Sequence, residues 1–280
     1  MRAFVVTVGS DEVDLASDVL WQLGVRAIEE RQEPGGVDRV ELWTAVGDEP
    51  DAVVRAVERL GDRWPTRVVE VVDDTADTWR EFARPMWVDE GSVVVPAWQD
   101  HVVGDGVVAI FIEPGGAFGL GDHPTTLLSL RAARRHLGVD REVLDVGCGT
   151  GVIAIMAAIM AARLGGGSVR AVDVASSAVE ATSANAIRNG VADRIVVDTT
   201  PVGDLDGTYD LVVANILAPT LVELADDLRR LTAPEGRLVI SGILADRHDH
   251  VVAALAPMLV ERTDVLDGWA AVTLAHPGSV

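Results

Sequence analysis

The spacing of apolar and polar positions over residues 1–72 predicts a small α+β domain. Strand-like runs occupy 3–8, 25–30, 40–46 and 66–72, and apolar residues recur at helical spacing over 11–23, before Gly24, and over 48–61. The resulting β-α-β-β-α-β order is that of the ferredoxin-like split unit. No catalytic grouping of side chains occurs in this stretch of sequence.

Residues 73–112 are predicted to form a linker followed by an introductory hairpin. The first part, 73–82, is polar and contains a tryptophan. It leads into two strand-like runs, WVDEGSVVVPAW at 87–98 and DGVVAIFIE at 105–113.

From Glu113 the pattern changes to that of an α/β domain, which we place at residues 113–280. Its short apolar runs are EVLDVG, SVRAVDV, DRIVVD, YDLVVANIL and GRLVISGIL, and amphipathic stretches separate them. This alternation predicts a parallel sheet with helices on both faces. The last two strand-like runs, within 257–276, leave no room for a helix between them, so the final strand is predicted to be antiparallel.

The helix predicted after EVLDVG contains a tandem repeat, because AIMA at 154–157 recurs at 158–161. One added turn lengthens a helix by about 6 Å and rotates the later residues by only about 40°, so the buried face is roughly kept. We interpret the repeat as a tolerated insertion.

Composition indicates a globular protein with one large and one small domain, since 49% of the 280 residues are apolar. Uncharged apolar runs of about 18 residues are missing, and the N-terminal stretch carries acids where a signal peptide would be apolar. We therefore expect a cytoplasmic protein without a membrane segment. No heptad pattern stands out, and a monomer is expected.

Charge narrows the classes of partner. The formal net charge is −21 and the sequence has no lysine, which argues against sequence-independent binding to nucleic acid. A basic, lysine-bearing protein would be steered toward such a surface. The single cysteine, Cys148, excludes an internal disulfide and a multi-cysteine metal site, and no metal site is predicted.

The run VLDVGCGTG at 143–151 combines an acid with three glycines. Asp145 precedes Gly147, Gly149 and Gly151, which lie between a predicted buried strand and a predicted helix. Glycines there let backbone N–H groups and the helix N-terminus approach a ligand closely. The spacing G-x-G-x-G differs from the dinucleotide pattern G-x-G-x-x-G, and the frame resembles the fingerprint of S-adenosylmethionine-dependent methyltransferases. An antiparallel last strand is likewise a feature of class I methyltransferase sheets.

Two further side chains lie at predicted strand ends. Asp173 closes SVRAVDV, where an acid accepts hydrogen bonds from both ribose hydroxyls of a nucleotide. An acid at this position also suits NAD, so Asp173 alone does not choose the cofactor. Asn215 closes YDLVVAN, where it is a candidate for orienting an amine, with a turn-capping role as the alternative. Ile216 and Leu217 follow it instead of an aromatic residue, which argues against a nucleobase substrate.

Taken in order, GGAFGLGDHPTT, VLDVGCGTG, VVANILAP and LVISGIL resemble the ribosomal protein L11 methyltransferase family, PrmA-like, over nearly the whole chain. The resemblance implies a Rossmann-like class I methyltransferase domain and an N-terminal substrate-recognition domain. It implies S-adenosyl-L-methionine as cofactor, contacted by Thr126, Gly147, Asp173 and Asn215, and ribosomal protein L11 as protein substrate. Two features depart from the family pattern, namely Leu120 in place of a threonine and the AIMA insertion.

The glycine-rich stretch 113–126 is then expected to be a lid-like loop across the methionine end of the cofactor. Thr126 is expected to bond the ligand, and Asp122 to face the chemistry only when the loop closes. His123 precedes a proline and is interpreted as a capping or turn residue, with substrate contact as the alternative.

The sequence leaves three other functions open. The chain could methylate another protein or a small amine, and it could be a catalytically silent cofactor-binding protein. A nicotinamide dehydrogenase is disfavoured by the glycine spacing. For the preferred hypothesis, Asn215 orients the amine or the methionine portion of the cofactor, bulk water is the final proton acceptor, and no residue is a compelling general base.

Overall fold

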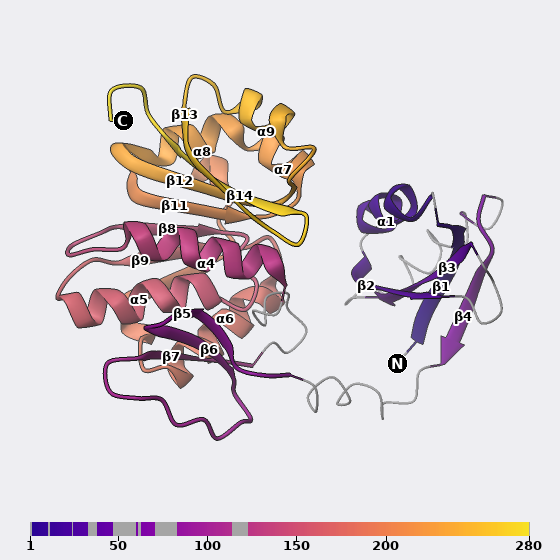
Figure 1. The fold of residues 1–280 in the computed structure, drawn as a ribbon, viewed down its shortest axis with the longest axis horizontal. Helices are drawn as coiled ribbons and strands as arrows, with labels where there is room; N and C mark the ends of the chain where they lie inside the picture. The colour runs from indigo at the N-terminus through magenta and orange to yellow at the C-terminus, as the bar shows by residue number, and fades with distance from the viewer. Residues whose placement is uncertain are drawn as a thin grey trace. The chain divides into compact units, whose positions relative to one another are not determined.

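The computed structural model describes residues 2–10, 12–23, 25–32, 38–46, 60, 63–70, 83–113 and 123–279. The chain divides into two compact units, Met1–Phe82 and Ala83–Val280 (Figure 1). Most of the helix predicted at 48–61, the 73–82 linker, Gly24 and the residues 114–122 with Leu120 and Asp122 lie outside the described residues.

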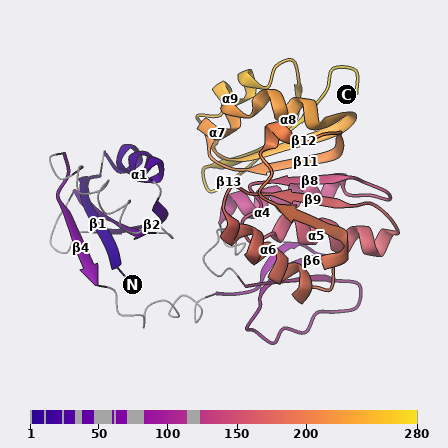
Figure 2. The ribbon, with the colours of Figure 1, turned by 180° about the vertical axis from the view of Figure 1, so that it is seen from behind.

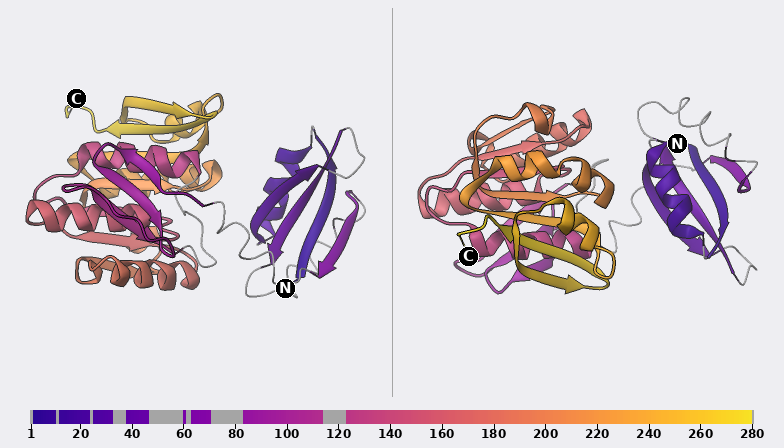
Figure 3. Two further views of the ribbon diagram at one scale, coloured as in Figure 1. Left: turned by 60° about the horizontal axis from the view of Figure 1, so that its bottom comes forward. Right: turned by 90° about the horizontal axis from the view of Figure 1, so that it is seen from above.

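The described strands of the small unit lie in the predicted ferredoxin-like order. Its described elements are β1 (Arg2–Gly9), α1 (Val13–Gln22), β2 (Val25–Gln32), β3 (Arg39–Val46) and β4 (Thr66–Glu70). The strands form an antiparallel sheet in the order β2-β3-β1-β4, and α1 runs along one face of it (Figure 3). Alternate residues of a strand share a face, so Phe4 and Val6 of β1 pack with Leu42 of β3 and Leu20 of α1 in one core.

The large unit begins with a three-stranded sheet that differs from the predicted hairpin. Its strands are β5 (Met86–Asp89), β6 (Ser92–Pro96) and β7 (Val108–Ile112), in the order β5-β6-β7. The hairpin lies within the first predicted run, β5 with β6, and the second run pairs with β6 in parallel. The connection from β6 to β7 crosses back before β7 starts, which a parallel neighbour requires.

The main sheet confirms the predicted class I methyltransferase topology. Its strands are β8 (Val143–Val146), β9 (Val169–Val172), β10 (Ile195–Asp198), β11 (Tyr209–Asn215), β12 (Thr232–Leu244), β13 (Leu259–Leu266) and β14 (Trp269–Ala275). They lie in the order β10-β9-β8-β11-β12-β14-β13, with β8 to β12 parallel and β14 antiparallel to both of its neighbours.

Helices cover both faces of this sheet, as predicted (Figures 1 and 2). One face packs on α4 (Pro124–His136), α5 (Val152–Leu164) and α6 (Ser176–Arg188), and the other on α7 (Ala218–Glu223), α8 (Ala225–Leu231) and α9 (Asp249–Ala254). In β11, Val213 joins the first core and Val212 the second. Among the described helices, none is long and apolar enough to span a bilayer.

The AIMA repeat continues α5 as one uninterrupted helix. Most of its second copy is buried like the first, with Ala158 at 0% and Met160 at 7% exposure. Beyond the repeat, Arg163 donates to the backbone oxygens of Gly106 and Val107 ahead of β7. The helix ends at Gly165 in the left-handed conformation, which glycine adopts without steric cost. The added turn therefore lies at the end of α5 remote from the 143–151 motif.

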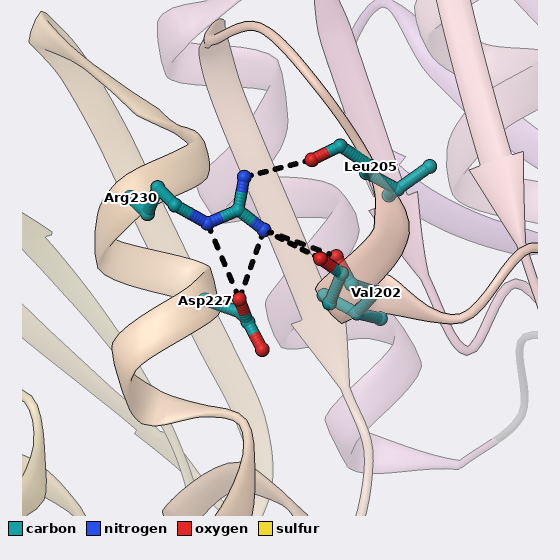
Figure 4. A network of polar contacts seen from close by, with 5 residues as sticks. Val202, Leu205, Asp227 and Arg230 are labelled. Carbon is teal, nitrogen blue, oxygen red and sulfur yellow. Dashed lines mark hydrogen bonds and ion pairs between the residues drawn. The ribbon is translucent and has the colours of Figure 1, made fainter.

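A guanidinium fixes the connection between β10 and β11. Arg230 of α8 donates to the backbone oxygens of Leu205, at 2.7 Å, and Val202, at 3.4 Å, and it pairs with Asp227 (Figure 4). Arginine suits this role because its planar fork presents several donors in a fixed geometry. The loop that leads into β11, and so to Asn215, is held against α8.

Candidate functional site

The carboxyl ends of the parallel strands meet at one edge of the main sheet. Register aligns Val146 of β8 with both Val172 of β9 and Ala214 of β11, and Asn215 with Ser241 of β12. In open α/β sheets, ligands bind outside this edge, where neighbouring connections leave in opposite directions. Most of the predicted site residues lie at or next to these strand ends.

The glycine turn, residues 147–151, links β8 to α5 with backbone angles that favour glycine. Gly147, Gly149 and Gly151 have φ values of 71°, 55° and 78°, in the left-handed region. A Cβ on Gly147 would lie 2.3 Å from Cγ2 of Ile216, and one on Gly151 would lie 2.6 Å from Cγ2 of Thr182. At Gly147 and Gly151 the turn thus passes too close to its neighbours for a side chain.

Asp173 is brought against this turn. Its Oδ2 accepts the Gly149 amide at 3.0 Å, and its Oδ1 accepts the Ala175 amide at 3.0 Å. The side chain is only partly buried, and each carboxylate oxygen retains a lone pair beyond these bonds. Asp173 can therefore order the glycine turn and still accept hydroxyl groups from a ligand.

Asp145 lies beneath the turn, with 1% of its surface exposed. Its Oδ2 accepts the amide of Ala154 in the first turn of α5 at 3.1 Å, and its Oδ1 has no partner in the part of the chain that the structure describes. Desolvation is the main reason that the pKa of this carboxyl is raised to about 7, opposed by the Ala154 bond and reinforced by the charge of Asp173. Burial likewise raises the pKa of the Cys148 thiol well above its usual range, so this thiol is inert at neutral pH.

The start of α4 faces the same edge. His123 is the N-cap residue, as interpreted from sequence, and its ring nitrogen accepts the Thr125 amide at 3.3 Å. The His123 ring packs edge-on against Trp269 at the start of β14, with ring centroids 5.0 Å apart. Thr126 is 1% exposed, and its hydroxyl has no hydrogen-bond partner among the described residues. A buried hydroxyl in this state is a ready donor or acceptor for a ligand.

Asn215 ends β11 between the glycine turn and β12. Its amide group has no hydrogen bond to the described part of the chain. The next residue, Ile216, packs its side chain against Gly147, and its backbone oxygen would lie 2.3 Å from a Cβ on Gly242. Gly242 has a φ of 86° and lies within the register shift of β12 between Ile240 and Ile243, so the strand bends around Ile216.

All seven predicted site residues thus lie near the carboxyl ends of β8, β9 and β11 or in the first turn of α4. Alternation in the strands directs Asp145 and Asn215 to the face covered by α4, because Val143 and Val213 pack there. Sequence reasoning gave no structural role at the site to Ile216, Gly242, Thr182 or Trp269. A glycine within a predicted strand was the only local signal for Gly242, and Ile216 was noted only as the residue after Asn215.

This edge suits a nucleoside-containing ligand. Asp173 has lone pairs for ribose hydroxyls, and the glycine turn allows close approach to backbone. The unpartnered Thr126 hydroxyl and Asn215 amide supply further hydrogen-bonding groups. Among the described residues, no cluster of His, Cys, Asp and Glu could hold a metal ion.

Comparisons with known proteins agree on one family. The family model for ribosomal protein L11 methyltransferase (PrmA) matches residues 48–276. A ribosomal protein L11 methyltransferase of Exiguobacterium sp. is 37% identical over 71% of this chain, which spans 64% of that relative's length. One from Heliobacterium modesticaldum is 33% identical over 88% of this chain and 80% of its own. The crystal structure of a ribosomal protein L11 methylase from Lactobacillus delbrueckii subsp. bulgaricus superposes with a TM-score of 0.63 at 30% identity, covering 69% of this chain and 99% of that one.

Proposed function

Because the chain belongs to the ribosomal protein L11 methyltransferase (PrmA) family, we propose that it transfers methyl groups from S-adenosyl-L-methionine to ribosomal protein L11. The acceptors are lysine side-chain amines, the N-terminal amine, or both. The observation that carries the proposal is the edge of the main sheet, where Asp173 bonds the glycine turn within the part of the chain that the family model matches. Methylation of another protein or of a small amine is the alternative that the test below addresses.

The residues at this edge fit the donor. Asp173 would hold the ribose hydroxyls, Gly147, Gly149 and Gly151 would lie along the nucleoside, and Thr126 would bond the methionine portion. When bound, S-adenosyl-L-methionine supplies an electrophilic methyl group on a sulfonium. Asp145 supports the arrangement from below, because it joins β8 to the first turn of α5.

Asn215 is proposed to orient the acceptor amine. Its amide oxygen can accept an amine N–H, and no bond to the described chain competes for that oxygen. Holding the nitrogen lone pair in line with the methyl group contributes through orientation, which is worth several kcal/mol in well-aligned reactions. The amine must be neutral to react, and entry into a desolvated site lowers its pKa. Released protons pass to bulk water.

The small unit, Met1–Phe82, is proposed to recognise the protein substrate. All seven residues assigned to the donor and amine belong to the other unit, which leaves the small unit free for recognition. The net charge of −21 favours encounter with a lysine-bearing protein and disfavours direct contact with nucleic acid. We propose a cytoplasmic monomer, with the boundaries 1–72, 73–112 and 113–280 for recognition domain, connecting segment and catalytic domain.

The direct test is incubation with labelled S-adenosyl-L-methionine and ribosomes or L11 lacking methylation. Label is expected on L11. The control is Asp173→Ala, which should abolish transfer because it removes the carboxylate that accepts hydrogen bonds from the ribose hydroxyls. Label on ribosomal RNA or on small amines, with none on L11, would contradict the assignment of L11 as the substrate. Calorimetry with S-adenosylhomocysteine, the product left by the methyl donor, provides a second test. A protein that does not bind this product is not an S-adenosylmethionine-dependent methyltransferase.

A further inference from the structure

Asn185 of α6 and Asn189, the C-cap residue of that helix, bond the backbone at the outer edge and end of β7. Asn189 accepts the Phe111 amide at 2.9 Å and donates to the Phe111 oxygen at 2.7 Å. Asn185 accepts the Glu113 amide at 2.9 Å and donates to the Glu113 oxygen at 2.9 Å. Each side-chain amide therefore makes the pair of bonds that a neighbouring strand would make.

The two asparagines match the strand because their spacing along the helix is close to the spacing of alternate residues along a strand. Asn185 and Asn189 are four residues apart, which is a rise of about 6.0 Å along a helix. Phe111 and Glu113 are two residues apart, which is about 6.6 Å along a strand. β6 occupies the other side of β7, so residues 111 and 113 present their polar groups to α6.

Asn185 differs from Asn189 by a contact with the glycine turn. Its Nδ2 also donates to the Thr150 oxygen at 3.0 Å, and its Oδ1 also accepts from Arg188 at 2.8 Å. Two donors and two acceptor positions are the full capacity of a primary amide, and all four are used. The side chain is 0% exposed.

The turn before Asn185 on the same helix makes a second contact of this kind. The Thr182 hydroxyl donates to the Gly149 oxygen at 3.0 Å. Successive carbonyl groups of the glycine turn, those of Gly149 and Thr150, are thus fixed against α6. A trans peptide directs its C=O and N–H in opposite directions, so these bonds also set the direction of the amides that follow.

We infer that Asn185 is a positioning residue for donor binding, because its amide locks the glycine turn to the end of β7 and to α6 at one buried point. The inference rests on the proposed function. Asn189 holds the same strand by the same bonds but does not touch the turn, so its side chain should be dispensable for donor affinity.

The experiment compares Asn185→Ala with Asn189→Ala in the full chain. Calorimetry with S-adenosylhomocysteine is expected to show affinity about tenfold lower for Asn185→Ala, the scale of one buried hydrogen bond, and a change of less than about twofold for Asn189→Ala. With L11 as substrate, the KM for S-adenosyl-L-methionine should rise with the dissociation constant while kcat stays within about twofold. Equal affinity in wild type and Asn185→Ala, or equal loss in both variants, overturns the inference.

Hydrogen exchange gives a readout without donor. In Asn185→Ala the amides of the glycine turn should exchange faster than in wild type, whereas in Asn189→Ala only the Phe111 amide should. If Asn185→Ala does not fold, Asn185→Asp replaces it, since a carboxylate can still accept from Glu113 and Arg188 but cannot donate to the oxygens of Thr150 and Glu113. An unprotected Glu113 amide in wild type contradicts the geometry, and a wild type that fails to bind donor product refutes the proposed function instead.

Discussion

At the glycine turn the protein's own side chains hold the backbone, whereas the Thr126 hydroxyl at the start of α4 and the Asn215 amide at the end of β11 have no hydrogen-bond partner among the described residues. Asp173, Thr182 and Asn185 bond the turn from three directions. Across the edge, the Thr126 hydroxyl and the Asn215 amide make no bond to the described chain. The first region is preorganised, and the second keeps hydrogen-bonding capacity for ligands.

The difference has an energetic side. A buried polar group without a partner costs about 1–3 kcal/mol of folding stability, so Thr126 and one oxygen of Asp145 are a standing cost to the fold. Such groups are expected where a ligand completes the bonds. Substitutions at the glycine turn should therefore lower stability, whereas substitutions of the polar groups in the second region should leave stability unchanged or raise it.

The largest expected effect concerns Asp145, which is buried beneath the glycine turn and accepts a hydrogen bond from the first turn of α5. An aspartate in the unfolded chain titrates near pH 4, whereas the folded protein raises the pKa of Asp145 to about 7. Between these values the folded state keeps a proton that the unfolded state has lost, so this residue lowers stability as pH rises, by up to about 4 kcal/mol. Asp145→Asn should remove that loss. Denaturant unfolding of both proteins from pH 4 to pH 8 checks this, and parallel curves would contradict it.

Gly147→Ala tests the preorganised region. The left-handed backbone and the approach of Ile216 should together cost about 3 kcal/mol of folding stability. Adding Ile216→Ala should relieve the steric part, so the double variant should lose less than the sum of the single losses. Additive losses measured by chemical denaturation would show that the two residues are not in contact.

Asn215→Ala tests the other region. Transfer to L11 should fall about a hundredfold, near 2.7 kcal/mol, because the amine loses its orienting group. Thermal stability should stay within about 0.5 kcal/mol of wild type, since the amide makes no bond to the described chain. A large drop in melting temperature would assign Asn215 to the fold instead.

Thr126→Val should have the smallest effect on stability, and the direction of the change is the test. Valine keeps the shape and removes an unpartnered buried hydroxyl, so the free protein should be more stable by about 1 kcal/mol. Affinity for S-adenosylhomocysteine should fall several-fold if the hydroxyl bonds the ligand. Thr125→Val is the matched control, because Thr125 is equally buried but its hydroxyl is bonded to His123.

The main sheet could be predicted from the sequence because the patterns that indicate it are local. Apolar runs and the absence of a helix before β14 can be recognised from neighbouring residues, and they predicted the parallel strands and the antiparallel last strand. The G-x-G-x-G spacing is equally local and predicted the glycine turn. Periodicity does not reveal which strands pair, so the parallel β6–β7 pairing replaced the expected hairpin. Contacts such as Ile216 with Gly147, or Asn185 with Glu113, join distant parts of the sequence and depend on the completed fold.

The asparagine pair on α6 also shields an edge. A small sheet that ends in an open strand offers unpaired backbone groups to other chains, and edge-to-edge aggregation follows that route. On β7 the amides of Asn185 and Asn189 occupy these groups with side chains. Loss of Asn189 is therefore expected to reduce solubility at high protein concentration even where catalysis is intact, so selection can preserve a residue that the reaction does not need.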